Sequence, residues 1–329
     1  MVTLADKNLK EIGHIKDANI SFDTNGEYEF SVQVARTNWF PELGFSSYIY
    51  ILGTEYGGIV GEILTDTTLD YVEVKGLTWR GLLHYKVIEP PTGSDYKKVS
   101  GEVNQVLKPL IEPVFSRLYV VSAENTGVTV SNYQFDRYCT LLDGIEKMLK
   151  SKGYRLRLRF QRDQGEPGYL FIESVPIRDY SNEIELSKDM RLNYTMDDKR
   201  NGVNHLIVTG KGELQNRNVF HLYVQKDGSV GKKQYYTGLE EITAVYENTS
   251  TETENLEEKA IEHLQKLMNT KTFKMDVAKL GLHVEIGDIV GGRDYLTGMY
   301  MSKPVENIIY EIIDDVESIT YKLEGEDAE

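Results

Sequence analysis

The feature that most constrains the fold is a strict alternation of apolar and polar residues close to the N-terminus. Apolar side chains occupy every second position from Tyr28 to Val34, and Glu29, Ser31 and Gln33 stand between them. A period of two predicts a strand that buries one face. An Asn-Gly pair directly precedes this run and favours a tight turn, so we expect a hairpin with the apolar segment before it.

Strand-like segments recur along the chain, but one region differs from the rest. Pro90–Ser94 reads Pro-Pro-Thr-Gly-Ser, which ends a strand and indicates a domain junction. We expect N-terminal strands in 1–94, an inserted α/β domain in 95–185, and a β-rich domain in 186–329 with one helix at about 256–268. The predicted fold class is therefore α+β, mainly β, with a small α/β insertion.

The charge and cysteine content narrow the possible partners. The 329 residues carry a net charge of −15, which repels phosphates and argues against general nucleic-acid binding. The single cysteine, Cys139, cannot form an intrachain disulfide, which suits a reducing cytoplasm. We find no leader sequence and no apolar run near the roughly 18 residues that span a bilayer. We expect synthesis in the cytoplasm and no membrane partner.

The sequence predicts no catalytic, cofactor-binding or metal-ligating residues. His205 and His221 could meet across a hairpin, but they lack a cysteine partner and an obvious third ligand. A Gly-Lys-Gly turn at Lys211 and Gly212 resembles a phosphate loop only superficially. The residue that should hold magnesium is replaced by Gly212, and Glu213 would oppose phosphate. Gly-x-Ser-x-Gly is also absent. We therefore expect a protein that is not an enzyme and binds no cofactor.

A basic stripe is the one local exception to the acidic composition. Arg155, Arg157 and Arg159 occupy alternate positions of a predicted strand and so share one face. The stripe could bind an acidic partner surface or an attached nucleic acid. The alternative is a solvated strand face balanced by nearby acids, which we favour.

One long stretch carries a family resemblance. Arg200–Arg217, together with Lys75–Leu83, His221–Val224, Tyr236–Glu241 and Ile286–Gly292 in the same order, resembles the siphovirus-type tail hub or baseplate hub family, the minor structural tail proteins of Gram-positive phages and prophages. The signature residues, to which the resemblance assigns a structural role, are Trp79, Arg80, Gly81, Asn204, His205, Gly210, Lys211, Gly212, Glu213, Arg217, Gly287 and Asp288.

The resemblance implies a tail-tip protein that forms a homotrimer. Each subunit would carry two tube-like β-barrel domains, completed by strands from both ends of the chain, with the α/β insertion outside. The partners would be further copies of itself, a tail tube or distal tail protein, and a spike, fibre or tape-measure protein. DNA would pass through the lumen without specific binding. The protein would be assembled in the host bacterial cytoplasm and reside in the virion tail. A siphovirus, a contractile phage or injection system and a phage-derived bacteriocin all remain open as its source.

Two other functions remain as alternatives. Phage hubs often carry a lytic domain at the C-terminus, so a tail-associated peptidoglycan hydrolase or endopeptidase is the first. Since the chain ends at Glu329, near the end of the hub fold, we expect no such domain. A carbohydrate-binding module that recognises the host is the second. The 22 tyrosines permit it, but two tryptophans are few for stacking on sugars.

Overall fold

The computed structural model describes residues 1–15, 18–163, 167–181, 194–249 and 253–325. The chain folds into two compact units. The larger unit contains Met1–Tyr194 and Lys274–Glu329, and the smaller unit contains Thr195–Phe273. None of the described helices is long and apolar enough to cross a bilayer.

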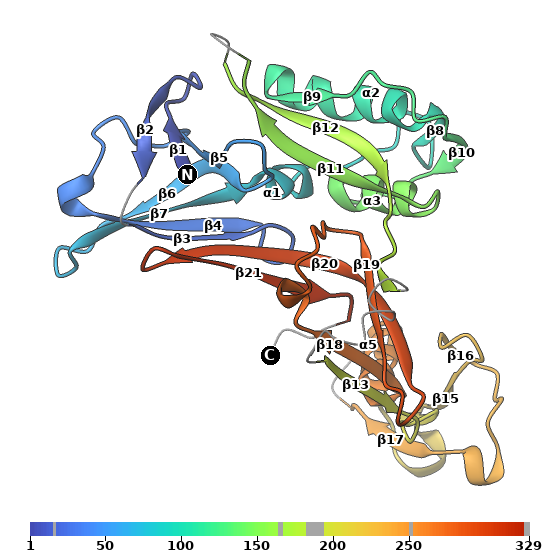
Figure 1. The fold of residues 1–329 in the computed structure, drawn as a ribbon. Helices are drawn as coiled ribbons and strands as arrows, with labels where there is room; N and C mark the ends of the chain where they lie inside the picture. The colour runs from blue at the N-terminus through green and yellow to red at the C-terminus, as the bar shows by residue number, and fades with distance from the viewer. Residues whose placement is uncertain (16–17, 164–166, 182–193, 250–252, 326–329) are drawn as a thin grey trace. The chain divides into compact units, whose positions relative to one another are not determined.

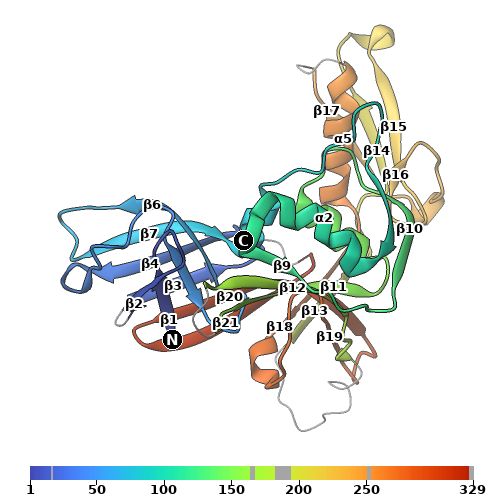
Figure 2. The same cartoon turned by 90° about the horizontal axis from the view of Figure 1, so that it is seen from above.

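A ten-stranded antiparallel sheet dominates the larger unit and is built from both ends of the chain (Figure 1). The strand order is β19-β20-β3-β4-β7-β6-β5-β1-β2, and β21 pairs with β20. The sheet curls into a half-barrel rather than lying flat (Figure 2). Its strands are β1 (Val2–Ala5), β2 (Glu11–Ile15), β3 (Ala18–Asp23), β4 (Glu29–Ala35), β5 (Tyr48–Ile51), β6 (Gly57–Leu64), β7 (Tyr71–Thr78), β19 (Ile289–Arg293), β20 (Tyr300–Ile313) and β21 (Val316–Leu323).

The alternating run found in the sequence is β4, and its apolar side chains form the core beneath the sheet. Phe30, Val32 and Val34 are buried while the residues between them are not. β4 pairs with β3 as the expected hairpin, with Phe22 opposite Phe30, but the connection runs from Thr24 to Tyr28 and is longer than the tight Asn-Gly turn that the sequence predicted. β3 in turn pairs with β20, so the N-terminal hairpin is completed by strands from the other end of the chain.

An α/β insertion interrupts the sheet between β7 and β19. It contains a three-stranded sheet, β11-β12-β9, a two-stranded sheet, β10-β8, and helices that share one apolar core. Cys139 packs against this core, and burial raises the pKa of its thiol. The elements are α1 (Trp79–His84), β8 (Lys98–Glu102), α2 (Val103–Phe115), β9 (Tyr119–Val121), β10 (Thr129–Gln134), α3 (Leu141–Lys150), β11 (Tyr154–Gln161) and β12 (Tyr169–Pro176).

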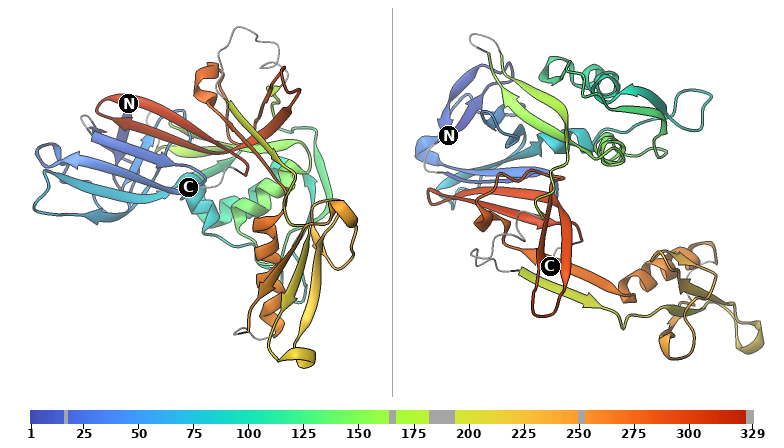
Figure 3. Two further views of the ribbon diagram at one scale, coloured as in Figure 1. Left: turned by 90° about the horizontal axis from the view of Figure 1, so that it is seen from below. Right: turned by 45° about the vertical axis from the view of Figure 1, so that its right-hand side comes forward.

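The smaller unit is a four-stranded sheet, β16-β15-β14-β17, with a helix packed along one face (Figure 3). Leu206, Val208 and Leu222 on that face contact the apolar stripe of α5, which includes Leu256 and Leu264. The remaining strands, β13 and β18, pair with each other and carry the chain into and out of the unit. The elements are β13 (Tyr194–Lys199), β14 (His205–Thr209), β15 (Val219–Val224), β16 (Val230–Gly231), β17 (Thr243–Glu247), α5 (Thr253–Leu267) and β18 (Thr270–Met275).

Short 3-10 segments supplement these elements in both units. They are η1 (Arg36–Asn38), η2 (Ser116–Leu118), η3 (Leu214–Asn216), η4 (Gly238–Glu240) and η5 (Val277–Leu280).

The predicted class, α+β and mainly β with an α/β insertion, is confirmed. The ranges 1–94 and 95–185 both belong to the larger unit, whereas 186–329 contributes strands to both units. The boundary between residues 185 and 186 lies outside the described residues. The helix expected at about 256–268 is α5.

Candidate functional site

The first three signature residues, Trp79, Arg80 and Gly81, begin α1 and are buried. The side chain of Thr78 caps the helix by accepting a hydrogen bond from the backbone N–H of Gly81. Trp79 is fully buried and stacks on Phe160, with ring centroids 5.3 Å apart. A Cβ at Gly81 would approach the carbonyl oxygen of Tyr28 to 2.4 Å, so only glycine fits this position.

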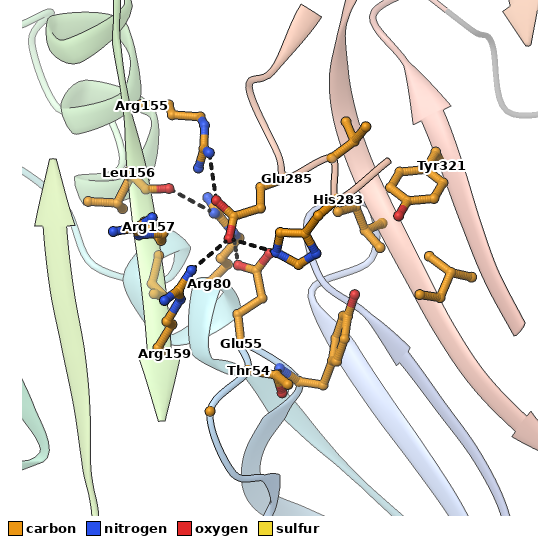
Figure 4. A pocket seen from close by; sticks show the side chains of 16 residues that line it. Thr54, Glu55, Arg80, Arg155, Leu156, Arg157, Arg159, His283, Glu285 and Tyr321 are labelled. Carbon is orange, nitrogen blue, oxygen red and sulfur yellow. Dashed lines mark hydrogen bonds and ion pairs between the residues drawn. The ribbon is translucent and has the colours of Figure 1, made fainter. Parts of the chain in front are cut away.

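Arg80 lies between these residues as a buried cation with three acceptors. Its Nε donates to Glu55 at 2.8 Å, its Nη1 to Glu146 at 2.7 Å, and its Nη2 to the carbonyl of Leu156 at 3.2 Å. Burial alone would lower the pKa of Arg80, but Glu55 and Glu146 hold it above its ordinary value. Burial raises the pKa of Glu146 despite the facing guanidinium. Figure 4 shows Arg80 with the Glu55 carboxylate and the Leu156 carbonyl to which it donates.

The last signature segment provides a second buried charge. Asp288 is 0% exposed. Its carboxylate accepts hydrogen bonds from Nε and Nη2 of Arg155 at 2.7 and 3.2 Å, and from the backbone N–H groups of Arg178 and Glu285, both at 3.0 Å. Gly287 has φ +90°, and a Cβ there would come within 3.0 Å of the Arg155 side chain. Glycine at this position therefore lets the backbone approach Arg155 closely.

Glu285 links the same arginine to its neighbours. It accepts from Nη2 of Arg155 at 2.5 Å and lies 3.4 Å from both Arg159 and His283. Burial alone would raise the pKa of Glu285, but Arg155 first, and then Arg157 and Arg159, hold it below its ordinary value. A cavity of about 180 Å³ lies among these side chains (Figure 4).

We call Glu55, Arg80, Glu146, Arg155, Glu285 and Asp288 the charged junction. It joins α1, β11 and the segment before β19, which are far apart in the sequence. Two signature segments meet here, because Arg155 binds Asp288 while the adjacent Leu156 accepts from Arg80. The described carboxylates of the junction are each engaged by a guanidinium, an arrangement that fixes geometry rather than preparing a general base.

The arginine stripe is neutralised by acids of the same unit. Arg157 donates to Glu173, its register partner on β12, at 2.8 Å, while Arg155 and Arg159 share Glu285. Nearby acids thus balance the stripe, as the favoured interpretation predicted, but the face is not solvated, because Arg155 is buried and Arg157 and Arg159 are partly buried.

The other signature residues lie in the smaller unit, mostly in the turn between β14 and β15. The backbone N–H of Gly210 donates to the carbonyl of Asn218, and the backbone N–H of Asn218 donates to the carbonyl of Lys211. These two bonds close the hairpin. Gly212 has φ +112°, and Arg217 donates to the carbonyl of Gly210 and pairs with Glu247. The exposed side chains of Lys211 and Glu213 flank the turn. The connection spans residues 210–218 and contains η3, so it is a longer hairpin loop than the Gly-rich β turn that the sequence predicted.

His205 is the first residue of β14, and Asn204 directly precedes it. Both contact the segment that leads into β17. Asn204 donates to the carbonyl of Glu240 at 2.6 Å and accepts from the N–H of Ile242 at 3.0 Å. Nδ1 of His205 lies 2.6 Å from Oε1 of Glu241, and its Nε2 lies 2.8 Å from Nδ1 of His221. The two histidines thus meet across the hairpin as expected. In the part of the chain that the structure describes, no group of three or more histidine, cysteine or acidic residues could hold a metal.

The sequence missed the partners of the buried cations. Glu55, Glu146 and Glu285 belong to no motif, and in a chain with 52 acidic residues nothing singles them out. Arg155 was noted only as part of the stripe. That the twelve signature residues mark a family stays a prediction, although several of them occupy positions where burial or backbone geometry restricts substitution.

No protein-family model and no curated protein matches the sequence. Solved structures with a similar fold include prophage tail protein gp18 from Listeria monocytogenes EGD-e (14% identity, 99% of this chain and 95% of that chain covered, TM-score 0.45). The tail protein from Neisseria meningitidis MC58 gives 15% identity, 98% and 95% coverage, and a TM-score of 0.44. The 43 kDa tail protein of prophage MuSo2 from Shewanella oneidensis is 12% identical, with 98% of this chain and 97% of that chain covered and a TM-score of 0.43.

Proposed function

We propose that this protein is a structural hub subunit at the tip or baseplate of a phage-type tail. Three copies would form a ring that continues the tail tube, and the ring would carry a spike or fibre. The proposal rests on the sequence resemblance and on one structural observation, which is the open edge of the large sheet.

The large sheet has unpaired edges within a single chain. Among the described strands, β2 pairs only with β1, and β21 pairs only with β20. A free edge presents unpaired backbone N–H and C=O groups and serves as a template for another chain, whereas closure into a ring removes it. A curled half-barrel that gains strands from neighbouring copies would become the tube-like barrel wall that the resemblance implies.

The charge suits a lumen through which DNA moves. Three copies would carry −45, three times the −15 of one chain. A negative wall repels phosphates, so DNA would pass without being held. The neighbours would be a tail tube or distal tail protein on one side and a spike, fibre or tape-measure protein on the other, within the virion tail.

We propose no catalytic role. In the charged junction, the acids are paired with arginines. These ion pairs hold segments of the larger unit together. A zymogram on bacterial cell walls tests this directly. We expect no clearing, and clearing by the purified chain would favour the hydrolase alternative.

Light scattering at several concentrations tests the ring. We expect a species of three times 37.6 kDa. Val316→Lys places a charge on edge strand β21, where Val316 is 66% exposed, and should reduce the trimer fraction. Val245→Lys, at a residue 64% exposed in the smaller unit, is the matched control and should leave it unchanged. The mass of one chain at every concentration, or equal effects of both variants, would contradict the proposal.

A further inference from the structure

The face of the four-stranded sheet opposite α5 carries a continuous chain of polar contacts. It runs from Glu241, through His205, to His221, with the distances given above. Oγ1 of Thr243 lies 3.1 Å from Nδ1 of His205, and Tyr223 stacks on the His205 ring at 4.5 Å. His205 is buried, whereas His221 is exposed. The chain therefore links the segment before β17 to both β14 and β15.

Only one placement of protons satisfies these contacts when both histidines are neutral. An ionised Glu241 only accepts, so Nδ1 of His205 must carry a hydrogen. A neutral imidazole has one N–H, so Nε2 of His205 is an acceptor. Nδ1 of His221 must then donate to it across 2.8 Å. The second nitrogen of the exposed His221 is left for the next proton.

Adding protons to this chain has two different consequences. The first added proton goes to Nε2 of His221, and both hydrogen bonds survive. A second added proton must go to Nε2 of His205, where two N–H groups would oppose each other at 2.8 Å between two cations. The bond between the two rings must then break, so the second protonation is coupled to separation of the rings.

We propose that His205, His221 and Glu241 form an acid-operated latch in the smaller unit. The latch holds β14, β15 and the segment entering β17 together while the histidines carry at most one added proton. It opens when they take up the second. Opening separates the His221 ring from the His205 ring and so loosens β15 against β14, while Glu241 stays bound to the protonated His205 and also accepts from Gln234 at 3.0 Å.

The charged surroundings of the latch are simple. Tyr223 faces it from β15, Glu241 and Thr243 from the segment entering β17, and Gln234 from the loop after β16. Of these side chains, only Glu241 carries a carboxyl group. The helix α5 packs on the opposite face through apolar side chains, and its own histidine, His263, stacks there on Tyr246.

Histidine NMR on the full chain tests the latch. The six histidines, labelled at Cε1, are assigned by single histidine-to-glutamine variants. We expect His205 and His221 to take up protons in two steps separated by about one pH unit or more. Across the lower step, amide exchange of residues 219–223 on β15, corrected for its intrinsic pH dependence, should rise roughly tenfold.

His221→Gln separates the latch from two independent histidines. The glutamine amide donates to neutral His205, and on acidification it can turn its oxygen toward the protonated ring. His205 should then titrate in one step, and the rise in exchange should disappear. His263→Gln is the matched control and should preserve both steps.

Independent single-step titrations in the wild type, or an exchange rise that persists in His221→Gln, would overturn the latch. Glu241→Gln provides a second variant, since removing its charge should shift the first uptake step to lower pH. An unshifted step in that variant would also count against the proposal. All these measurements follow side chains within one unit, so their outcome does not depend on whether the protein forms the proposed ring.

Discussion

The charged junction of the larger unit and the latch of the smaller unit each connect segments that are distant in the sequence. The junction uses arginines, which stay protonated at every pH a protein survives, and its most buried members are almost inaccessible to water: Arg80 is 3% and Asp288 0% exposed. The latch uses two imidazoles, one of them exposed, and imidazole is a side-chain group that can gain a proton on mild acidification. Both sets of contacts thus hold separate segments together, the junction at every pH and the latch only until its histidines bind a second proton.

The comparison also concerns magnitude. Breaking a buried ion pair leaves an uncompensated charge and costs about 3–5 kcal/mol, whereas an exposed pair contributes about 0–1 kcal/mol. Removing a group from the junction should therefore destabilise the fold strongly at all pH values. Removing a group from the latch should have a small effect that depends on pH.

The largest effect is expected for Asp288→Ala. It leaves Arg155 without its main partner and two backbone N–H groups without an acceptor. We expect a loss of about 4 kcal/mol in the free energy of unfolding, measured by urea denaturation. Asp136→Ala, which breaks an exposed pair with Lys147, is the control and should lose less than about 1 kcal/mol. Similar losses in the two variants would break the distinction between buried and exposed charges.

Arg80→Met should follow, with a loss of about 3 kcal/mol at pH 7, because Glu55 and Glu146 lose their shared cation. Without the guanidinium, the already raised pKa of Glu146 should rise further. A carboxyl whose folded pKa is raised binds protons more tightly when folded, so stability recovers as pH falls through that value. Unfolding measured at pH 7 and pH 5 should show a smaller loss at pH 5. A loss that grows on acidification would contradict this assignment.

Glu285→Gln should have an intermediate effect of roughly 1–2 kcal/mol at pH 7. The pKa of Glu285 is lowered in the folded state, with burial opposed by Arg155 and its neighbours. Such a group stabilises the fold above its unfolded pKa of about 4.3, and that contribution is lost as pH falls through the lower folded value. The wild-type advantage over the variant should therefore be complete at pH 7 and shrink below about pH 4. Glu213→Gln, on an exposed turn of the smaller unit, should show no such trend.

Sequence reasoning recovered what depends on local pattern. The alternation around Phe30 predicted β4, and the Gly-Lys-Gly segment lies in a connection between two strands, although that connection is a longer loop with a 3-10 helix and not a tight turn. The buried positions Arg80 and Asp288 were singled out by resemblance alone, since an isolated charged residue carries no signal of its burial.

What sequence reasoning could not supply is the pairing of distant segments. β3 joins β20 across nearly the whole chain, and Arg155 finds Asp288 far along the sequence. No periodicity encodes such contacts. Glu241 was likewise hidden, because a glutamate before a strand is an ordinary surface residue until the fold brings it to His205.

The smallest effect at neutral pH is expected for His221→Gln, and it tests the comparison most sharply. The side chain is exposed and the replacement keeps a donor for His205, so the loss at pH 7 should stay within about 0.5 kcal/mol. On acidification, the folded wild type can bind its second added proton only by breaking the contact between the two rings, which costs free energy. The unfolded chain binds protons without that cost. The wild type therefore loses stability that the variant retains, and in local exchange measurements the sign of the difference should reverse between pH 7 and an acid pH. Asp288→Ala, by contrast, should remain less stable than the wild type at both pH values, because no proton can replace the charge that Arg155 requires.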